Sequence, residues 1–191
     1  HAARRQSHDG GSAPKPPLRA APDRPLVLLS NDDGVFAPGL RALREALAEH
    51  ATVIVCAPEL NQSATSHSLS LHRILRLREL EPGVFAVDGT PADCVYTALH
   101  SGTRILPRRP DLVVSGMNHG LNLGVDVFYS GTVAAAREAA IRGLPAVALS
   151  ADSGADRGAA AAVGAAIALA TLAAYRRAPT AAAPLLSVNI P

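Results

Sequence analysis

The sequence predicts a doubly wound α/β fold, a Rossmann-like three-layer sandwich in which helices cover both faces of a mostly parallel sheet. Short apolar runs alternate with longer segments of helical periodicity, and several runs end in polar and glycine residues, as expected of strands buried on both faces. The length of 191 residues allows one substantial domain of this kind. A content of 48% hydrophobic and 18% charged residues is typical of a folded chain.

The first strand, helix and second strand have the clearest pattern. Residues 26–30 form a continuous apolar run, and residues 52–56 form the next one. Between them, Pro38 takes a first helical position ahead of a stripe of leucines at helical spacing. This segment therefore predicts a βαβ unit, the building block of a parallel sheet.

The remaining elements follow with interruptions. The Glu81-Pro82-Gly83 sequence predicts a turn between two short strands, and Pro91 predicts the start of a helix. Glu138 and Arg142, spaced i,i+4, predict an ion pair near the end of another helix. The sequence thus predicts strands over 74–77, 84–87, 111–115, 146–150 and 185–190, and helices over 91–100, 132–142 and 159–175.

The chain divides into two parts. Residues 1–25 mix basic residues with Pro, Gly, Ser and Ala and lack the apolar core of a secretory signal, which predicts a flexible leader. Residues 26–191 form the predicted α/β core. Cys56 and Cys94 are too few and too far apart for a disulfide framework, so we expect reduced, buried thiols.

Composition argues against two classes of partner. Aromatic residues make up 3% of the chain, Trp is absent and the net charge is +2, so no nucleic-acid polymer is expected as a partner. The apolar stretch 159–175 is mostly alanine, which contributes little to membrane transfer. We therefore expect a core helix there, no membrane partner and a cytoplasmic location.

An acidic pair, Asp32 and Asp33, directly follows the first predicted strand. Adjacent carboxylates repel each other, and a cation is the usual means of holding them together. An Asx-turn that also caps the next helix explains the same residues, so this pattern alone leaves both interpretations open.

Oxygen-bearing side chains follow two other predicted strands. Ser63 lies in a hydroxyl- and amide-rich loop over 59–68, and Asn118 lies in a glycine-rich segment over 115–124. Ligands of open parallel sheets bind at the carboxyl ends of the strands. Two carboxylates, a hydroxyl and an amide oxygen would suit one Mg²⁺, Mn²⁺ or Ca²⁺ ion better than zinc.

The segment Tyr129-Ser130-Gly131-Thr132 opens a predicted helix. The free N–H groups and hydroxyls of such a helix start can bind a phosphate, although a plain N-cap explains the same residues. A cation and a phosphate site together would support attack of water on a phosphoryl group.

These motifs, taken together, resemble the survival protein E family of metal-dependent 5′-nucleotidases. The resemblance covers residues 26–191 in order and spacing. It rests on residues 28–34 with 37–39, on Ala57-Pro58 leading to Ser63 and Ser68-Leu69, on 89–91 with 93–95, on 115–118 with Gly120 and 122–124, and on 129–133.

The resemblance implies roles for particular residues. Asp32, Asp33, Ser63 and Asn118 would bind one divalent cation, with Asp32 or Asp33 also accepting a proton from water. Ser130, Gly131 and Thr132 would bind phosphate, and Asn31 and Asn122 would be further pocket residues. His67 and His119 lie near the motifs, but neither occupies a motif position that assigns it a general-acid role.

It also implies hydrolysis of nucleoside 5′-monophosphates, and of 3′-monophosphates as well, by a homodimer or homotetramer. The chain departs from the family pattern at two places. Phe36 stands where many members have His, and the chain ends at Pro191, where members usually continue with a C-terminal segment implicated in subunit exchange and closure of the active site.

The alternative is a regulatory α/β module that binds a metal or nucleotide without catalysis. A receiver-type module would need a lysine near its last strand, but the only lysine is Lys15, in the predicted leader. A dinucleotide-binding domain would need a glycine-rich first turn, whereas this turn reads Asn31-Asp32-Asp33-Gly34. A metal-binding regulator that lacks catalysis stays open.

Overall fold

The computed structural model describes residues 24–191, so the predicted leader falls almost entirely outside the described residues. One sheet of seven strands organises this part of the chain, in the order β3-β4-β2-β1-β5-β6-β7. All strand pairs are parallel except β3 with β4. The strands are β1 (Leu26–Ser30), β2 (Thr52–Pro58), β3 (Leu77–Glu81), β4 (Val84–Val87), β5 (Leu112–His119), β6 (Ala146–Ala151) and β7 (Leu185–Ile190).

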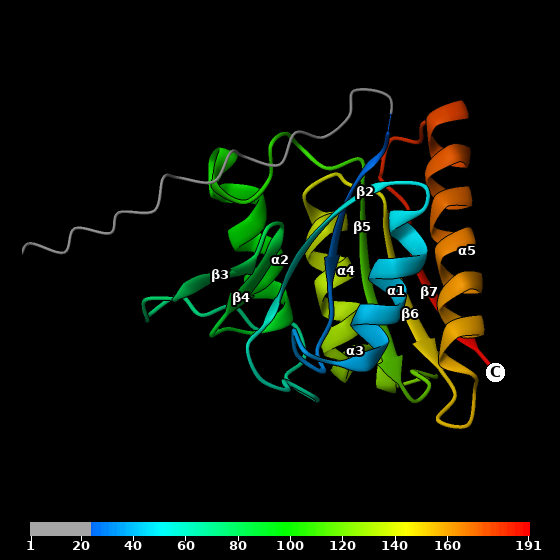
Figure 1. Cartoon of the computed structure of the whole chain (residues 1–191), viewed down its shortest axis with the longest axis horizontal. Coiled ribbons are helices and arrows are strands. Elements are labelled where there is room, and N and C mark those ends of the chain that lie inside the picture. The colour runs from blue at the N-terminus through cyan, green and yellow to red at the C-terminus, as the bar shows by residue number, and fades with distance from the viewer. Residues whose placement is uncertain (1–23) are drawn as a thin grey trace, which may run out of the picture.

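Helices cover both faces of the sheet, as the sequence predicts (Figure 1). One core layer joins α1 and α5 to the sheet through leucines and alanines, and the other joins α2 and α4. Alternate residues of β1 serve the two layers, because successive side chains of a strand point to opposite faces. The helices are α1 (Pro38–Ala48), α2 (Pro91–His100), α3 (Asp126–Tyr129), α4 (Gly131–Ile141) and α5 (Arg157–Arg177), with a 3₁₀ turn η1 (Gly102–Arg104).

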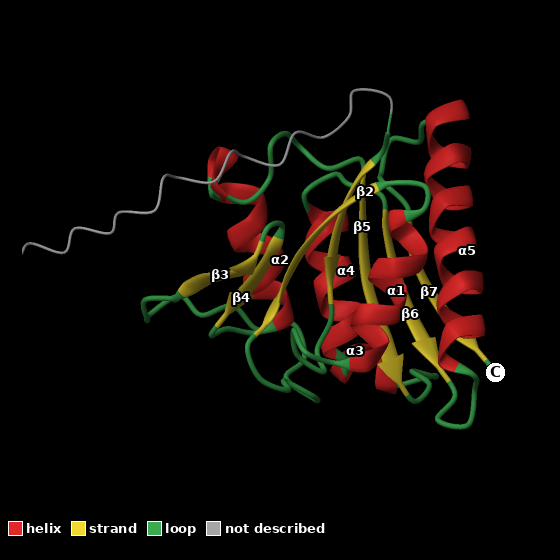
Figure 2. Ribbon diagram, viewed as in Figure 1, coloured by secondary structure: helices red, strands yellow, loops and turns green. Residues whose placement is uncertain are grey.

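The carboxyl ends of the parallel strands meet at one end of the sheet, where α3 also lies (Figure 2). There β5 bulges between Ser115 and Asn118. Gly116 has a φ of 140°, and a Cβ atom at this position would lie 2.4 Å from the carbonyl oxygen of Leu149. Only glycine allows β5 to approach β6 this closely. Beyond the bulge, Asn118 pairs with Ser150 of β6 and lies past the end of β1, whose last residue, Ser30, pairs with Ser115.

Most predicted elements are confirmed within a few residues, but β5 extends four residues beyond the end predicted for it at 115, and the 3₁₀ turn η1 was not predicted. Two further differences concern the hairpin and α3. The first strand of the hairpin is Leu77–Glu81 rather than 74–77, because a turn of two residues, Pro82 and Gly83, pairs Glu81 with Val84. The short helix α3 was not predicted, because its four residues lack the length over which a helical period can be recognised.

Helix α5 is long and apolar enough to cross a membrane by length and composition, with a mean hydropathy of 1.8. Helices of protein cores pass the same test. Here α5 packs against α1 and the sheet through one face, which includes Ala160, Ala165, Ala168 and Leu172. This packing agrees with the predicted core helix.

Candidate active site

Asp32 lies against the start of α4. Its side chain is 4% exposed, and its Oδ1 accepts a short hydrogen bond from the Thr132 hydroxyl. A Cβ atom added to Gly131 would lie 2.7 Å from the Cβ of Asp32, so only glycine permits this contact. The predicted acidic and phosphate motifs, 100 residues apart in sequence, therefore meet in space.

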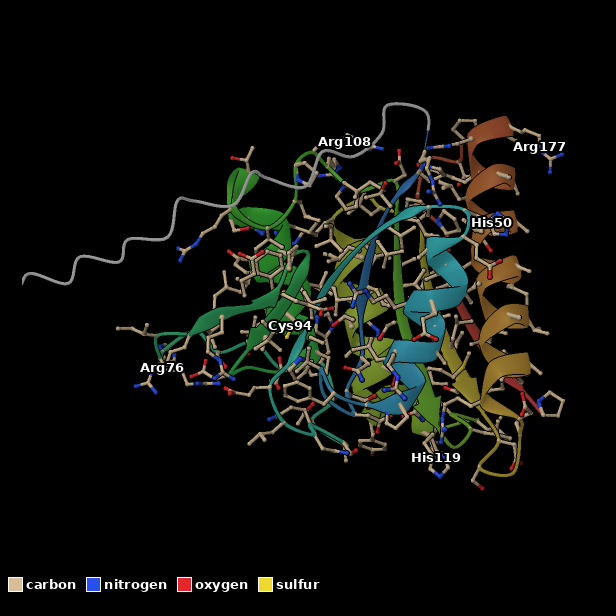
Figure 3. All side chains as sticks on the ribbon, viewed as in Figure 1. His50, Arg76, Cys94, Arg108, His119 and Arg177 are labelled. Atoms are coloured by element: carbon tan, nitrogen blue, oxygen red, sulfur yellow. The ribbon has the colours of Figure 1, made fainter. Side chains whose placement is uncertain are left out.

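Asp33 borders a cavity of about 360 Å³ at the carboxyl end of the sheet. Its Oδ2 lies 3.4 Å from the backbone N–H of His119, which donates to it. Asn118, His119, Asp152 and Arg157 also line the cavity. His119 projects at this end of the molecule (Figure 3). The two carboxylates thus have different surroundings, with Asp32 held by α4 and Asp33 open to the cavity.

The pKa of each carboxyl group is raised above the ordinary value of 3.8. For Asp32, burial is the largest cause and the negative charge of Asp33 adds to it, while hydrogen bonds from Thr132 oppose them. For Asp33, burial outweighs the lowering effect of His119. Within residues 24–191, no ion pair reaches either group. The chain therefore places two acidic groups together without neutralising them.

Three further polar atoms near these strand ends lack hydrogen-bond partners among the described residues. They are the hydroxyl oxygens of Ser30 and Ser115 and the Oδ1 atom of Asn31, all buried. Ser30 and Ser115 are direct partners in the β1–β5 register. Because buried polar groups are normally satisfied, these oxygens together with the two carboxylates fit a site for a hard cation and its water.

Ser63 belongs to a loop that reaches Asp32. The backbone N–H of Gln62 donates to the carbonyl oxygen of Asp32 at 2.7 Å. The Ser63 hydroxyl donates to Asn61 Oδ1 at 2.7 Å, so its own oxygen keeps lone pairs that could bind a cation. The structure thus brings the Ser63 loop beside the acidic pair.

Asn118 occupies the extended end of β5. Its amide nitrogen donates to the carbonyl oxygen of Gly120 at 2.8 Å, which leaves Oδ1 as the atom able to bind a cation. Residues 24–191 contain no group of three or more His, Cys, Asp or Glu side chains suited to a metal. A cation at this site would therefore need neutral oxygen ligands, as the sequence predicts.

The start of α4 has the form expected of an anion site. Ser130 caps the helix, its hydroxyl accepting from the backbone N–H of Val133 at 3.2 Å. The hydroxyl hydrogen of Ser130 stays available as a donor, as do N–H groups of the first helical turn. Thr132 also bonds to Asp32, so an anion bound here would adjoin the acidic pair.

Asn31 and Asn122 have clear framework contacts. Asn31 donates to the carbonyl oxygen of Gly34 at 2.9 Å, and Asn122 donates to the Ser150 hydroxyl at 2.8 Å. The backbone N–H of Asn122 also donates to Asn189 Oδ1 on β7 at 2.8 Å. These bonds hold the turns after β1 and β5, and the predicted pocket roles of the two asparagines stay predictions.

Two polar residues of the cavity and one contact between distant side chains were not predicted from the sequence. Asp152 lines the cavity from the segment after β6, and Arg157 lines it from the first residue of α5. The position of Asp152, two residues beyond the strand predicted over 146–150, was a usable signal. His67 contacts the buried Glu138 of α4 at 2.9 Å, and no local pattern relates residues so far apart. The predicted Glu138–Arg142 pair is present at 2.9 Å.

Comparisons with known proteins find relatives in one family. A family model described as "Survival protein SurE" matches residues 27–191. A curated relative named 5′-nucleotidase SurE, from Sorangium cellulosum strain So ce56, is 72% identical over 168 residues, or 88% of this chain. A second relative of that name, from Pelobacter propionicus, is 55% identical over 124 residues, or 65% of this chain. The chain spans 65% of the length of the first relative and 49% of the second.

The crystal structure of the SurE protein from Aquifex aeolicus is similar to this fold. Its TM-score is 0.73 at 44% sequence identity, covering 78% of this chain and 60% of that one. The family match extends over every motif that suggested the resemblance, from the strand before Asp32 to the helix start at Thr132. The chain therefore belongs to the survival protein SurE family.

Proposed function

We propose that this chain is a divalent-metal-dependent phosphomonoesterase that releases phosphate from nucleoside 5′-monophosphates, and from 3′-monophosphates as well. One observation carries the proposal: Asp32, half of an acidic pair with a raised pKa, is bonded to the helix start of α4 through Thr132. Relatives named 5′-nucleotidase SurE, 72% and 55% identical to this chain, support it.

Four side chains would hold the cation: Asp32, Asp33, Ser63 and Asn118. The chemistry supplied by a bound Mg²⁺ or Mn²⁺ ion is neutralisation of negative charge and polarisation of the phosphoryl group. Oxygen ligands suit both ions, and also Ca²⁺ as a bound substitute, so the donor set favours a hard cation without choosing one.

The chain itself would position the substrate and move the proton. The Ser130 hydroxyl and the first N–H groups of α4 would bind phosphoryl oxygens as negative charge develops on them. Asp33 borders the cavity, so it is better placed than the buried Asp32 to accept a proton from attacking water. A cavity of about 360 Å³ lies within the size range of small-molecule sites, about 300–1,000 Å³.

The wider proposal is a cytoplasmic enzyme, acting as a homodimer or homotetramer and built on one core over residues 26–191. Its substrates are small nucleotides rather than nucleic-acid polymers. The low aromatic content of 3% agrees with loose selection of the base.

Phosphate release from 5′-AMP, 3′-AMP and p-nitrophenyl phosphate tests the proposal. We expect release with Mn²⁺ or Mg²⁺, and none in excess EDTA. Release that continues in EDTA would contradict a metal-dependent mechanism. Tight Mn²⁺ binding without release from any of the three compounds would instead support the regulatory, non-catalytic alternative.

A further inference from the structure

We propose that His67 is a positioning residue, which holds the cation-binding Ser63 in place by bonding to the buried Glu138 of α4. This inference rests on the proposed function, since it concerns the cation site of that reaction. It assigns a role to a buried acidic side chain that the mechanism above does not use.

Glu138 is 2% exposed, which is unusual for a carboxylate. Its Oε2 lies 2.9 Å from His67 Nε2, and its Oε1 accepts from Arg142 Nε at 2.9 Å. The Arg142 guanidinium in turn lies 5.0 Å from the centre of the Tyr96 ring on α2. Because a carboxylate that accepts from Arg142 offers only acceptor atoms, the His67 ring donates from Nε2.

The loop that carries Ser63 needs such a support. Ala64 and Ser66 have φ angles of 59° and 55°, a left-handed conformation that residues other than glycine seldom adopt. Such a backbone persists only where its surroundings hold it in place. Ala64 directly follows Ser63, so relaxation of this segment would move the proposed cation ligand.

Hydrogen bonds hold the loop at other places too, among them a bond of 2.7 Å from the Thr90 hydroxyl to the carbonyl oxygen of Ser68. Gln62 donates to the carbonyl oxygen of Asp32 at 2.7 Å. Ser66 donates through its backbone N–H and its hydroxyl to the carbonyl oxygens of Tyr129 and Phe128, at 3.1 and 2.9 Å. Those two acceptors belong to the four-residue helix α3, whereas Glu138 belongs to the eleven-residue helix α4.

Helix α4 also bonds to Asp32 through Thr132. The His67–Glu138 bond therefore ties Ser63 and Asp32, two proposed ligands of one cation, to the same helix. Loss of this bond should lower cation affinity. The reaction rate at saturating cation should change little, because the remaining ligands and the start of α4 are untouched.

Four substitutions separate this role from a general effect on folding. His67→Ala removes the bond, and Arg142 still neutralises Glu138, so we expect the variant to fold. His67→Gln keeps an N–H donor at similar reach, whereas His67→Asn keeps a polar amide but is too short. His72→Ala is the matched control, an exposed histidine five residues further along.

The Mn²⁺ dissociation constant is measured without substrate by titration calorimetry, and kcat for 5′-AMP is measured at saturating Mn²⁺. We expect His67→Ala and His67→Asn to weaken Mn²⁺ binding about tenfold, the lower end of the range for residues that orient a metal ligand. Their kcat should stay within about twofold of the unmodified protein. His67→Gln should restore most of the affinity, and His72→Ala should change neither quantity.

Unchanged Mn²⁺ affinity in both His67→Ala and His67→Asn would overturn the inference. An equal loss of Mn²⁺ affinity in His67→Gln and His67→Asn would also overturn the inference, because the position of the donor atom would then not matter. If His67→Ala does not fold, the comparison of His67→Gln with His67→Asn still tests the inference. An unmodified chain that neither binds Mn²⁺ nor releases phosphate would overturn the proposed function, and this inference with it.

Discussion

Aspartates at the two ends of the sheet have opposite surroundings. At the amino end, Asp111 accepts hydrogen bonds from Arg108 at 2.7 Å and from the Leu26 N–H at 2.7 Å, and it pairs with Arg176 at 2.8 Å. At the carboxyl end, Asp32 is bonded to Thr132 and lies beside the like charge of Asp33. Figure 3 shows Arg108 at the end of the molecule opposite His119.

The pKa values follow the surroundings. Partial burial alone would raise the pKa of Asp111, but hydrogen bonds from Arg108, Leu26 and Arg176 outweigh it and lower the pKa below 3.8. Burial raises the pKa of Asp32 because no such cation offsets it. Asp111 is thus neutralised by arginines of the fold. Asp32 lies where the described residues supply no positive charge, so a bound cation could neutralise it.

The largest expected effect is on activity. Asp32→Asn should lower metal-dependent phosphate release from 5′-AMP by more than about 100-fold, because it removes a charged cation ligand without changing side-chain volume. Asp111→Asn should stay within about twofold of the unmodified protein in the same assay. Similar losses of phosphate release in both variants would contradict a functional difference between the two ends of the sheet.

For the free energy of unfolding, we expect Asp111→Asn to have a larger effect than Asp32→Asn. In EDTA at neutral pH, Asp111→Asn should lower the free energy of unfolding by about 1–2 kcal/mol, since it weakens several hydrogen bonds to a charged group. Asp32→Asn should cause no loss, because it removes an uncompensated buried charge. Urea unfolding followed by circular dichroism measures both, and a less stable Asp32→Asn variant would count against the account.

The start of α4 should contribute a smaller effect. Ser130→Ala removes the hydroxyl that accepts from the Val133 N–H, and loss of such a cap costs about 1 kcal/mol. The proposed phosphate role adds a rise in KM for 5′-AMP. Thermal unfolding and steady-state kinetics separate the two effects, and an unchanged KM would limit Ser130 to capping.

The smallest effects concern pH. The stability contributed by Asp111 is present above about pH 3.8 and is lost as the pH falls through its lowered pKa. For Asp32 the sign is opposite: without metal, stability falls as the pH rises from 3.8 through the raised pKa, because the folded state holds the proton more tightly. Urea unfolding in EDTA from pH 3 to 7, compared with each asparagine variant, measures both slopes. Slopes of the same sign would contradict the comparison.

Local pattern was sufficient for most of the fold. Apolar runs and proline positions predicted β1, β7 and the start of α1 at the residues observed. For β1 and α1 the reason is that a strand buried on both faces is continuously apolar and that proline favours the first turn of a helix. The edge strand β7 is mostly exposed or half-buried, so burial on both faces does not explain its prediction. The family resemblance is also confirmed. The hairpin strand β3 shifted because its register depends on the turn, and its alternation is too weak to fix its limits.

The candidate site was predictable only in part. Motifs placed Asp32, Asp33, Ser63 and Asn118 near strand ends, and the structure gathers their segments at one end of the sheet. Contacts between distant residues, such as Thr132 with Asp32, arise from packing that no local period encodes. The ligand roles stay predictions until metal binding is measured.

Mn²⁺ binding to the unmodified chain, Asp32→Asn and Asp111→Asn, measured by titration calorimetry without substrate, shows whether a cation binds at the carboxyl end of the sheet. We expect one Mn²⁺ per chain for the unmodified protein and for Asp111→Asn, with binding lost or weakened more than about tenfold in Asp32→Asn. Equal binding by Asp32→Asn and the unmodified chain would contradict a cation site at the carboxyl end of the sheet.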